Sequence, residues 1–362
     1  MQQQAVFRTD ASLSLGSGHV RRCLVLRDTL ARLGWATRIA GIPETLDAIP
    51  GLRRDDAFQT LAGSETEVAE SLRRTWPKGV ELLVVDSYRL DAAFESACRP
   101  WAKRILVIDD LADRRHDCDI LLDANYGRRP ADYRGLVPST SRLLIGPRHC
   151  LLRSEFRENR ARSLARRRRA RSVERVFVSM GGVDPMNATS LALKALARAG
   201  FRCRAAVVLG SAAPHLPQVK RLIRKLPYAV QLHLDCDRVA AVMADCDLAL
   251  GAGGTMAWER FCLGLPSVIV PIAENQLAAA QALARDRQAL VSAPLWRLQE
   301  RDLAELVKVA LGARGFRGRL QARNARRVDG DGARRVAATV GRLLGDPAAQ
   351  RRSSVRAEDP KR

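Results

Sequence analysis

Short apolar runs alternate with longer amphipathic segments along most of this chain, and the alternation begins twice. Such a rhythm is typical of βα units that build a parallel sheet. In the first series we expect strands at 5–9, 36–40, 81–86 and 104–109, with a helix at 19–33. In the second we expect strands at 175–179, 203–209, 229–234, 248–250 and 267–270, helices at 187–199, 218–225, 255–263 and 275–284, and further helices after 301. The pattern predicts an α/β protein with two Rossmann-like domains.

The length of the chain agrees with two domains. It has 362 residues, of which 47% are hydrophobic, enough for two buried cores. An arginine-rich stretch at 160–171 separates the two series and is typical of a surface helix or a linker. We expect an N-terminal Rossmann-like domain at 1–155, a linker at 156–172, a C-terminal domain at 173–345, and a disordered tail at 346–362, which lacks apolar periodicity.

The charge leaves two interpretations open. Lys and Arg number 61 against 39 Asp and Glu, a net charge of +22, which fits either a nucleic-acid or membrane partner or an arginine-rich solvated surface. We favour the solvated surface because the charges are spread along the chain and only 5% of residues are aromatic, which leaves few platforms for stacked bases. Nucleic-acid binding remains an alternative.

The cysteines and the N-terminal residues indicate a cellular compartment. The eight cysteines form no CxxC pair and no regular framework, which favours a reducing environment. The first residues lack a basic region followed by an apolar core, and no run approaches the roughly 18 apolar residues of a membrane span. We therefore expect a soluble, cytoplasmic protein.

The sequence points to no metal and no cofactor. Its five histidines show neither HxxxH nor HExxH spacing, and the acidic pair Asp109-Asp110 is explained more simply by a turn after a strand. Neither GxGxxG nor GxxxxGK[ST] occurs, so nothing supports a standard dinucleotide or P-loop site.

Three glycine-containing loops each follow an expected strand and open an expected helix. They lie at 16–19, 181–187 and 251–255. In parallel α/β sheets ligands bind at the carboxyl ends of strands, where free helix amides favour phosphates. The joint occurrence of the loops predicts a phosphorylated ligand in a cleft between the domains.

The first loop ends in a histidine, His19, which carries the strongest catalytic hypothesis. An imidazole takes a proton near neutral pH, so His19 at a helix N-terminus beside flexible backbone is a candidate general base. The alternative is a helix-opening residue whose ring is satisfied by backbone. Asp10 is a candidate to orient His19, or it caps the following helix. Gly16 and Gly18 would let the backbone approach a ligand closely.

The third loop is followed by three polar candidates. Glu259 falls in the first turns of the helix after Gly254, where it could accept hydrogen bonds from two ribose hydroxyls or simply complement the helix dipole. Asn275 and Gln276 follow the next strand, where they could bind polar ligand groups or cap the following helix.

Taken together, these motifs resemble one enzyme family. The motifs are Asp10 with Gly16-Ser17-Gly18-His19, Asp86-Ser87-Tyr88, Val107-Ile108-Asp109-Asp110, Asp123-Ala124-Asn125-Tyr126-Gly127, Gly181-Gly182 with Asp184-Pro185 and Asn187, Gly251-Ala252-Gly253-Gly254-Thr255, and Glu274-Asn275-Gln276. Over about residues 5–310 the chain resembles the UDP-2,4-diacetamido-2,4,6-trideoxy-β-L-altropyranose hydrolases of pseudaminic acid biosynthesis, the PseG family. That family is similar to UDP-sugar glycosyltransferases with two Rossmann-like domains in the GT-B arrangement.

The resemblance implies a reaction and roles for residues. His19 would activate water for inverting attack on the anomeric carbon with release of UDP, and the C-terminal domain would hold most of the nucleotide. The implied catalytic residues are His19, Asp10, Tyr88 and Asn275. The implied substrate-binding residues are Gly16, Gly18, Asn125, Gly182, Gly253, Gly254, Thr255, Glu259 and Gln276, with Gly182, Gly253 and Gly254 at the pyrophosphate and Glu259 at the ribose.

The chemistry fits a single base without a metal. A departing pyrophosphate is already a stable anion and needs electrostatic support more than protonation. We therefore expect a metal-independent hydrolase that produces a free 2,4-diacetamido-2,4,6-trideoxyhexose for nonulosonic acid synthesis. The alternatives are a GT-B glycosyltransferase that uses a UDP-sugar donor, a nucleic-acid-binding protein, and a non-catalytic sugar-nucleotide sensor.

Overall fold

The computed structural model describes residues 2–12, 16–61, 63 and 65–345. The described chain divides into two compact units: the first contains the described residues up to Leu151 and those at 331–345, and the second contains Leu152–Gly330. The tail expected at 346–362 lies outside the described residues. No helix in the described part of the chain is long and apolar enough to cross a membrane.

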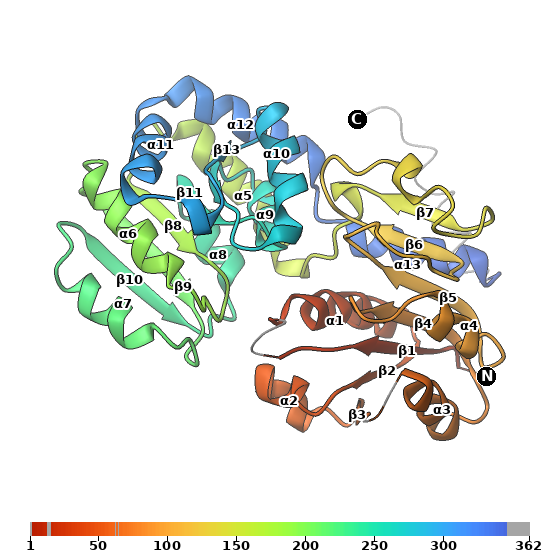
Figure 1. Cartoon of the computed structure of the whole chain (residues 1–362). Coiled ribbons are helices and arrows are strands. Elements are labelled where there is room, and N and C mark those ends of the chain that lie inside the picture. The colour runs from red at the N-terminus through yellow and green to blue at the C-terminus, as the bar shows by residue number, and fades with distance from the viewer. Residues whose placement is uncertain (1, 13–15, 62, 64, 346–362) are drawn as a thin grey trace. The chain divides into compact units, whose positions relative to one another are not determined.

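The first unit is built on a parallel seven-stranded sheet in the order β3-β2-β1-β4-β5-β6-β7 (Figure 1). Its strands are β1 (Gln4–Thr9), β2 (Ala36–Gly41), β3 (Phe58–Thr60), β4 (Val80–Asp86), β5 (Ala102–Ile108), β6 (Ile120–Asp123) and β7 (Arg142–Ile145). Its helices are α1 (Gly18–Ala31), α2 (Thr45–Ala48), α3 (Glu65–Thr75), α4 (Ala92–Cys98) and α13 (Gly332–Leu343), with 3-10 turns η1 (Pro50–Arg54), η2 (Pro130–Tyr133) and η3 (Pro147–His149).

The strand order places one pair of loops together in this unit. β1 and β4 are neighbours, with Thr9 opposite Asp86 at their carboxyl ends. The chain leaves β1 toward β2 on one side and leaves β4 toward β5 on the other, so β1 and β4 flank the topological switch point, where ligands bind in sheets of this kind. Both strands are almost entirely buried, since helices cover both faces of the sheet.

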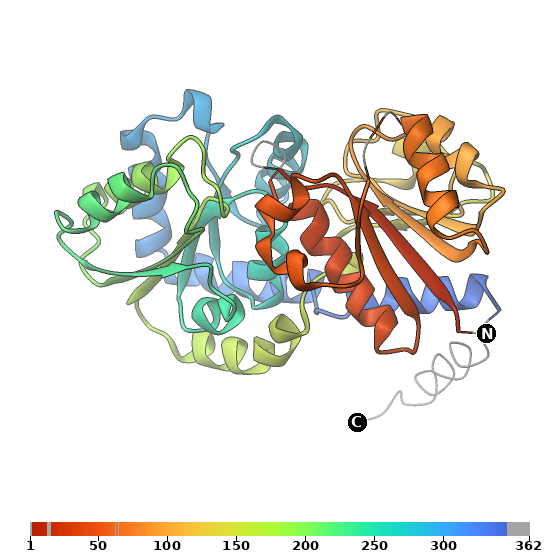
Figure 2. The same ribbon diagram turned by 90° about the horizontal axis from the view of Figure 1, so that it is seen from below.

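The last helix of the described chain returns to the first unit, which differs from the expected C-terminal domain at 173–345. α13 packs against α1, and in two views it lies among the elements of the first unit (Figure 1, Figure 2). Its residues Ala333, Val336, Ala337 and Val340 share one face and are buried in the core of that unit. This contact depends on long-range packing, which the periodicity of α13 alone does not reveal.

The second unit contains a parallel six-stranded sheet in the order β10-β9-β8-β11-β12-β13. Its strands are β8 (Arg175–Ser179), β9 (Arg204–Leu209), β10 (Ala229–Leu234), β11 (Leu248–Ala252), β12 (Ser267–Val270) and β13 (Leu290–Val291). Its helices are α5 (Ser154–Arg169), α6 (Ala188–Arg198), α7 (Leu216–Ile223), α8 (Val239–Ala244), α9 (Met256–Cys262), α10 (Leu277–Arg285), α11 (Glu300–Gly312) and α12 (Arg314–Arg327), with 3-10 turns η4 (Glu274–Gln276) and η5 (Leu295–Arg297).

A second switch point lies between β8 and β11. These strands are neighbours, Gly251 lies opposite Ser179, and the chain runs from β8 toward β9 but from β11 toward β12. The loops at 181–187 and 251–255 follow these two strands. The order of the strands therefore brings the second and third glycine loops to the same edge of one sheet.

The arginine-rich stretch expected as a linker at 156–172 is mostly α5, a helix of the second unit that packs against α8 and α9. Arg167 is buried, and its guanidinium donates to the carbonyl oxygens of Met243 at 2.7 Å, Cys246 at 2.9 Å and Leu263 at 2.6 Å. Several carbonyl groups together satisfy the planar donors of a buried arginine. Part of the basic stretch is thus internal structure.

Most expected strands lie where the apolar runs predict them, but three strands of the first unit were missed. They are β3, β6 and β7, of three or four residues each. Loops and 3-10 turns, not helices, connect β5 to β6 and β6 to β7. The alternation of periods that indicates a βα unit is therefore absent there.

Candidate functional site

The chemistry of the first unit gathers at the carboxyl ends of β1 and β4. The loop after β1 brings Gly16, with φ of +76°, before α1, and His19 is the second residue of that helix. Only glycine adopts such a backbone angle without strain. The His19 side chain is buried, as is Asp86 at the end of β4. The start of a helix and the end of a strand far apart in the sequence thus place an imidazole beside a carboxylate.

The ring of His19 is oriented by Asp86. Nδ1 lies 2.5 Å from Oδ1 of Asp86. An ionised carboxylate only accepts hydrogen bonds, so Nδ1 carries the proton in the neutral ring and Nε2 carries the lone pair. The arrangement therefore presents Nε2 as a base and stabilises the imidazolium that forms when it takes a proton.

Arg22, one turn further along α1, holds Asp86 in place. Its Nη2 donates to Oδ1 and its Nε donates to Oδ2 of Asp86, both at 2.6 Å. Burial alone would raise the pKa of Asp86, but the charges and hydrogen bonds of Arg22 and His19 outweigh it and hold that pKa well below its usual range. Asp86 thus stays ionised beside the histidine.

Tyr88 completes this cluster. Its ring meets that of His19 edge to face, with centroids 4.5 Å apart. Its hydroxyl donates to Oδ2 of Asp110 at 3.2 Å, and Nη1 of Arg22 donates to the same oxygen at 3.1 Å. The expectation that Tyr88 and His19 belong together agrees with this placement. We call His19, Arg22, Asp86, Tyr88 and Asp110 the histidine cluster.

The structure gives Asp10 a different partner from the one expected. Asp10 pairs with Arg8, and its Oδ1 accepts a hydrogen bond from the amide of Ile42 at 3.0 Å. Among the described residues no hydrogen bond joins Asp10 to His19, and the orienting carboxylate is Asp86. Asp10 directly follows β1, and its carboxylate reaches the residue after β2, whereas Asp86 ends β4 on the other side of β1. The expectation for Asp10 was therefore wrong in this respect.

Asn125 lies close to the histidine cluster but is tied to a loop. Its Nδ2 donates to the carbonyl oxygen of Asp110 at 3.1 Å, and its amide donates to Asp123 at 2.8 Å. Asn125 thus supports the backbone that carries Asp110. Gly18, the first residue of α1, is exposed and leaves the backbone before His19 open to solvent.

In the second unit, the loop at 181–187 does not offer the free helix amides that were expected. The carboxylate of Asp184 accepts from the amides of Ala188 at 2.8 Å and Thr189 at 2.9 Å, at the start of α6. An acidic residue thus already occupies this helix N-terminus. Gly182, by contrast, has nothing within 4 Å of the place where a Cβ would stand, so its backbone is open to a ligand.

The loop at 251–255 is held by Gln276. Oε1 of Gln276 accepts from the amides of Gly253 and Ile272, each at 3.1 Å. The amide of Gly253 is therefore used within the protein, whereas in the described part of the chain the amides of Gly254 and Thr255 have no acceptor. Gln276 thus joins two loops through hydrogen bonds, a role that the sequence did not indicate.

A buried arginine lies beneath the same loop. Arg260 is fully buried, its Nη2 donates to the carbonyl oxygen of Ala252 at 2.6 Å, and its Nε and Nη1 have no partner among the described residues. Burial lowers the pKa of Arg260 to about 10. A Cβ on Gly251 would collide with this guanidinium and with the carbonyl oxygen of Ser179. Gly251 is thus a packing requirement, and Arg260 places a positive charge under the loop.

The remaining candidates of the second unit lie around this loop. Glu259 is half-buried on α9, with Oε1 3.9 Å from Nη2 of Arg153. Thr255 precedes α9 without capping it through its side chain, and Asn275 is exposed in η4. In the described ranges no group of three or more His, Cys, Asp or Glu side chains could hold a metal ion.

Sequence reasoning assigned no role to three residues of the histidine cluster, namely Arg22, Asp86 and Asp110. A signal was present for each of them. Asp86 ends one apolar strand and Asp110 follows another, as acidic residues at a ligand-binding edge do. Arg22 lies three residues after His19, a spacing that places both side chains on one face of a helix. What was missing was the knowledge that β1 and β4 are neighbours.

Comparison with known proteins supports the resemblance. No protein-family model matches the chain. The chain is 25% identical over 284 residues to the UDP-2,4-diacetamido-2,4,6-trideoxy-β-L-altropyranose hydrolase of Campylobacter jejuni, a match that covers 78% of this chain and 96% of that protein. It is 28% identical over 289 residues to the spore coat polysaccharide biosynthesis protein SpsG of Bacillus subtilis, covering 78% and 81%.

Solved structures establish the fold. MurG of Acinetobacter baumannii matches 94% of this chain and 99% of its own, with a TM-score of 0.67 and 13% identity. The glycosyltransferase of kitacinnamycin matches 95% and 100%, with a TM-score of 0.63 and 16% identity. The resemblance drawn from the motifs is thus confirmed: the chain is similar over most of its length to a UDP-diacetamido-trideoxyhexose hydrolase, and its two parallel-sheet domains have the GT-B glycosyltransferase fold.

Proposed function

We propose that this protein hydrolyses a UDP-linked 2,4-diacetamido-2,4,6-trideoxyhexose at the anomeric carbon, releasing UDP and the free sugar. The observation that carries the proposal is the histidine cluster, in which buried Asp86 orients His19 and is itself held ionised by Arg22. The similarity to a hydrolase of this substrate class, which spans 96% of that protein, supports the same conclusion.

The reaction divides between the two units. In the first, Nε2 of His19 takes a proton from water as the water oxygen attacks the anomeric carbon. The bond from that carbon to the diphosphate oxygen breaks, and its electron pair leaves with UDP. Asp86 stabilises the imidazolium that results. Because attack and departure occur on opposite faces of the sugar, the product has inverted configuration.

The second unit would hold the nucleotide. The amides of Gly254 and Thr255 and the open backbone at Gly182 are suited to the diphosphate, and the positive charge of Arg260 supports an anion on the loop above it. Glu259, beside that loop, is suited to the ribose hydroxyls. A diphosphate leaving group stabilised in this way needs no metal and no acid.

The proposal is tested by incubating the purified protein with a panel of UDP-sugars and no acceptor. We expect release of UDP from the 2,4-diacetamido-2,4,6-trideoxy sugar, unchanged by a chelator, and NMR of the anomeric proton should show that the first product has inverted configuration. If UDP appears only when an acceptor is added, the reaction is a glycosyl transfer.

A glycosyltransferase that uses a UDP-sugar donor is the second candidate. It is favoured by one observation, the GT-B fold that this chain shares with MurG and the kitacinnamycin glycosyltransferase. The same UDP-sugar panel with and without acceptors separates the two candidates. A third result, tight binding of UDP-sugar that stays intact after prolonged incubation, would identify a sensor.

A single methyl group tests the diphosphate position. A Cβ on Gly182 would touch nothing in the protein, so Gly182→Ala should leave the melting temperature unchanged. If the diphosphate lies against this backbone, the added methyl should weaken UDP binding roughly tenfold, which is about 1.4 kcal/mol. Calorimetric titration with UDP measures this effect.

The matched control is Gly312→Ala, at the end of α11, where a Cβ also meets nothing. It should change neither the melting temperature nor the affinity for UDP. Unchanged UDP affinity in Gly182→Ala would show that the diphosphate does not lie against the loop at 181–187.

A further inference from the structure

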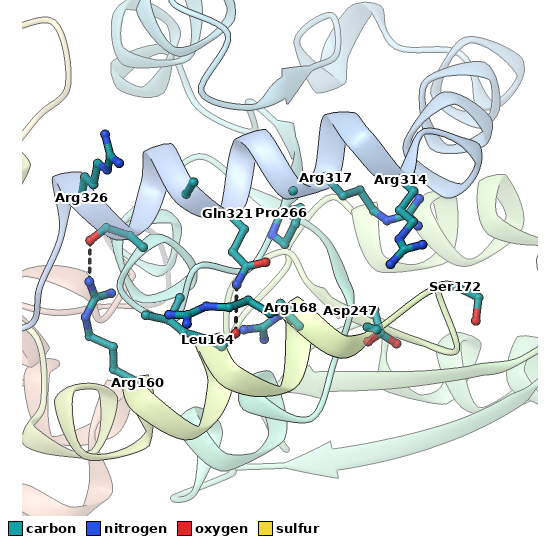
Figure 3. Close-up of a pocket in the computed structure, with 15 residues that line it drawn as sticks. Arg160, Leu164, Arg168, Ser172, Asp247, Pro266, Arg314, Arg317, Gln321 and Arg326 are labelled. Carbon is teal, nitrogen blue, oxygen red and sulfur yellow. Dashed lines mark hydrogen bonds between the residues drawn. The ribbon is translucent and has the colours of Figure 1, made fainter.

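A recess lined by arginines lies at the opposite edge of the second unit's sheet from the glycine loops. A cavity of about 510 Å³ opens between α5 and α12, and Figure 3 shows arginines of the two helices around it. Asp247 precedes β11 and Pro266 precedes β12, so the cavity lies at the amino ends of these strands. β11 has five residues, and a strand of that length is roughly 16 Å long, so a nucleotide on the loop at 251–255 would not fill this cavity.

The lining is strongly positive. Six arginines border the cavity, and the only acidic residue among the lining residues is Asp247; the arginines are Arg160, Arg167, Arg168, Arg314, Arg317 and Arg326. Asp247 is already engaged, because Arg166 donates to its Oδ1 at 2.8 Å and the amides of Glu174 and Arg175 donate to its Oδ2. The hydrogen-bond acceptors of the Asp247 carboxylate are thus already used by donors of the protein.

The arginines differ in what they do. Arg160 and Arg167 are structural, since they donate to backbone carbonyl groups of the second unit. Arg168, Arg314 and Arg326 are exposed, and within the described ranges no acceptor or carboxylate pairs with them. Three cations without counter-charges therefore surround a recess whose other walls are already satisfied.

At one end of the recess two positive charges, those of Arg314 and Arg317, repel each other. Burial lowers the pKa of Arg317, the charge of Asp247 partly offsets this, and the charge of Arg314 lowers it further. Figure 3 shows Arg314 and Arg317 close together on α12, with Arg168 on the α5 side of the recess. Like charges held near one another destabilise a fold unless an anion lies between them.

We propose that this recess binds a small, free polyphosphate, such as inorganic di- or triphosphate, through Arg168 and Arg314. Arg317, whose Nη1 already donates to the carbonyl oxygens of Ala310 and Leu311, adds positive charge beside them. Arginine binds phosphate oxygens through paired N–H donors, and several such contacts on one ligand require a multivalent anion. The volume is in the range of small-molecule sites.

Two larger anionic partners fit the recess less well. No aromatic side chain lines it, so it offers no platform for the stacked bases of a nucleic acid. None of the exposed large apolar side chains identified in the described residues, Leu33, Met186, Trp296 and Val309, lines it either, and such residues usually accompany basic ones at a lipid surface. The lining is that of a site for a small soluble anion.

The experiment uses inorganic tripolyphosphate as the probe and the full chain saturated with UDP, so that the loops at 181–187 and 251–255 are blocked. Calorimetric titration should show binding that weakens steeply as salt is added. The double variant Arg168→Gln and Arg314→Gln should lower the affinity at least tenfold, because each lost contact is a charge-assisted hydrogen bond.

The matched control is the double variant Arg169→Gln and Arg319→Gln. It removes the same charge from the same two helices at exposed positions that do not line the recess. It should keep the affinity for tripolyphosphate within about twofold, as expected for distant charges screened by salt. Both double variants should release UDP from substrate at the wild-type rate.

Three results would overturn the proposal. The first is displacement of tripolyphosphate by UDP, which would assign the probe to the glycine loops. The second is equal loss of affinity in the two double variants, which would show that binding depends only on the net charge of the protein. The third is tighter binding, at equal phosphate concentration, to a twenty-nucleotide single strand or to phosphatidylglycerol vesicles, which would identify a nucleic-acid or membrane surface. Failure of the hydrolase proposal would leave the binding measurements interpretable, since only the comparison of UDP release depends on turnover.

Discussion

Replacement of His19 by glutamine is expected to lower the rate of UDP release by roughly 10²- to 10⁴-fold, the usual effect of removing a general base. Glutamine keeps a polar side chain but cannot take the proton from water. The affinity for UDP should stay near that of the wild type, because the amides and glycines suited to the diphosphate belong to the second unit. Steady-state release of UDP and calorimetric titration with UDP measure the two effects separately.

The matched control is His116→Gln in the same unit. His116 is also buried, and its Nδ1 lies 2.8 Å from Oε1 of Glu95. This variant should lose stability but keep its turnover rate at temperatures well below unfolding. If His19→Gln retains the wild-type rate, His19 is not the base. If it loses UDP affinity in proportion to rate, His19 acts in binding.

Replacement of Asp86 by asparagine should have two effects, one on rate and one on stability. Without the carboxylate the imidazole loses the group that fixes its tautomer and stabilises its cation, and we expect a fall in turnover of roughly 10³-fold or more. Arg22 would lose the negative charge of its buried partner and one of its two hydrogen bonds, because the amide of asparagine has a single acceptor oxygen. Removal of one partner of a buried ion pair costs about 3–5 kcal/mol of unfolding free energy.

The stability effect has a defined pH dependence. The pKa of Asp86 in the folded protein lies below that of an unfolded aspartate, about 3.9. The ionised form therefore stabilises the fold fully above about pH 4 to 5, and this contribution is lost as the pH falls toward the folded-state value. The difference in unfolding free energy between wild type and Asp86→Asn should thus shrink as the solution is acidified below about pH 4, which denaturant titrations over a pH series will measure.

Asp119→Asn is the matched control for this variant. Asp119 also pairs with two arginines, Arg99 at 2.6 Å and Arg104 at 2.9 Å, but it precedes β6 at the amino edge of the sheet. It should lower stability without changing the turnover rate. A comparable loss of turnover in both variants would mean that Asp86 acts only through stability.

The sequence alone predicted the class of fold and the type of chemistry. Alternation of apolar runs and helical patterns is a local property, and it indicated two parallel-sheet domains and most of their strands. The glycine loops and His19 were also visible, because residues after strands in such folds lie at the ligand-binding edge. The short strands β3, β6 and β7 were not predicted because runs of three or four residues carry little periodicity.

The sequence could not show which loops meet. Whether Asp10 or Asp86 orients His19 depends on which carboxylate the packing of α1 brings beside the imidazole, because one aspartate follows β1 and the other ends β4. Likewise, nothing local in the third loop showed that Gln276 accepts a hydrogen bond from the amide of Gly253, or that Arg260 is buried beneath Gly251. These contacts join residues whose meeting depends on strand order and helix packing.

The sequence by itself thus determined two α/β domains, the glycine loops and a candidate base at His19. Only the tertiary structure decided that Asp86 and Arg22 hold that base, that α13 belongs with the first unit, and that the arginines of α5 and α12 enclose a recess. The physical reason is the same in each case. Periodicity and turn chemistry are local, whereas charge pairing and burial depend on which distant segments the sheet order and helix packing bring together.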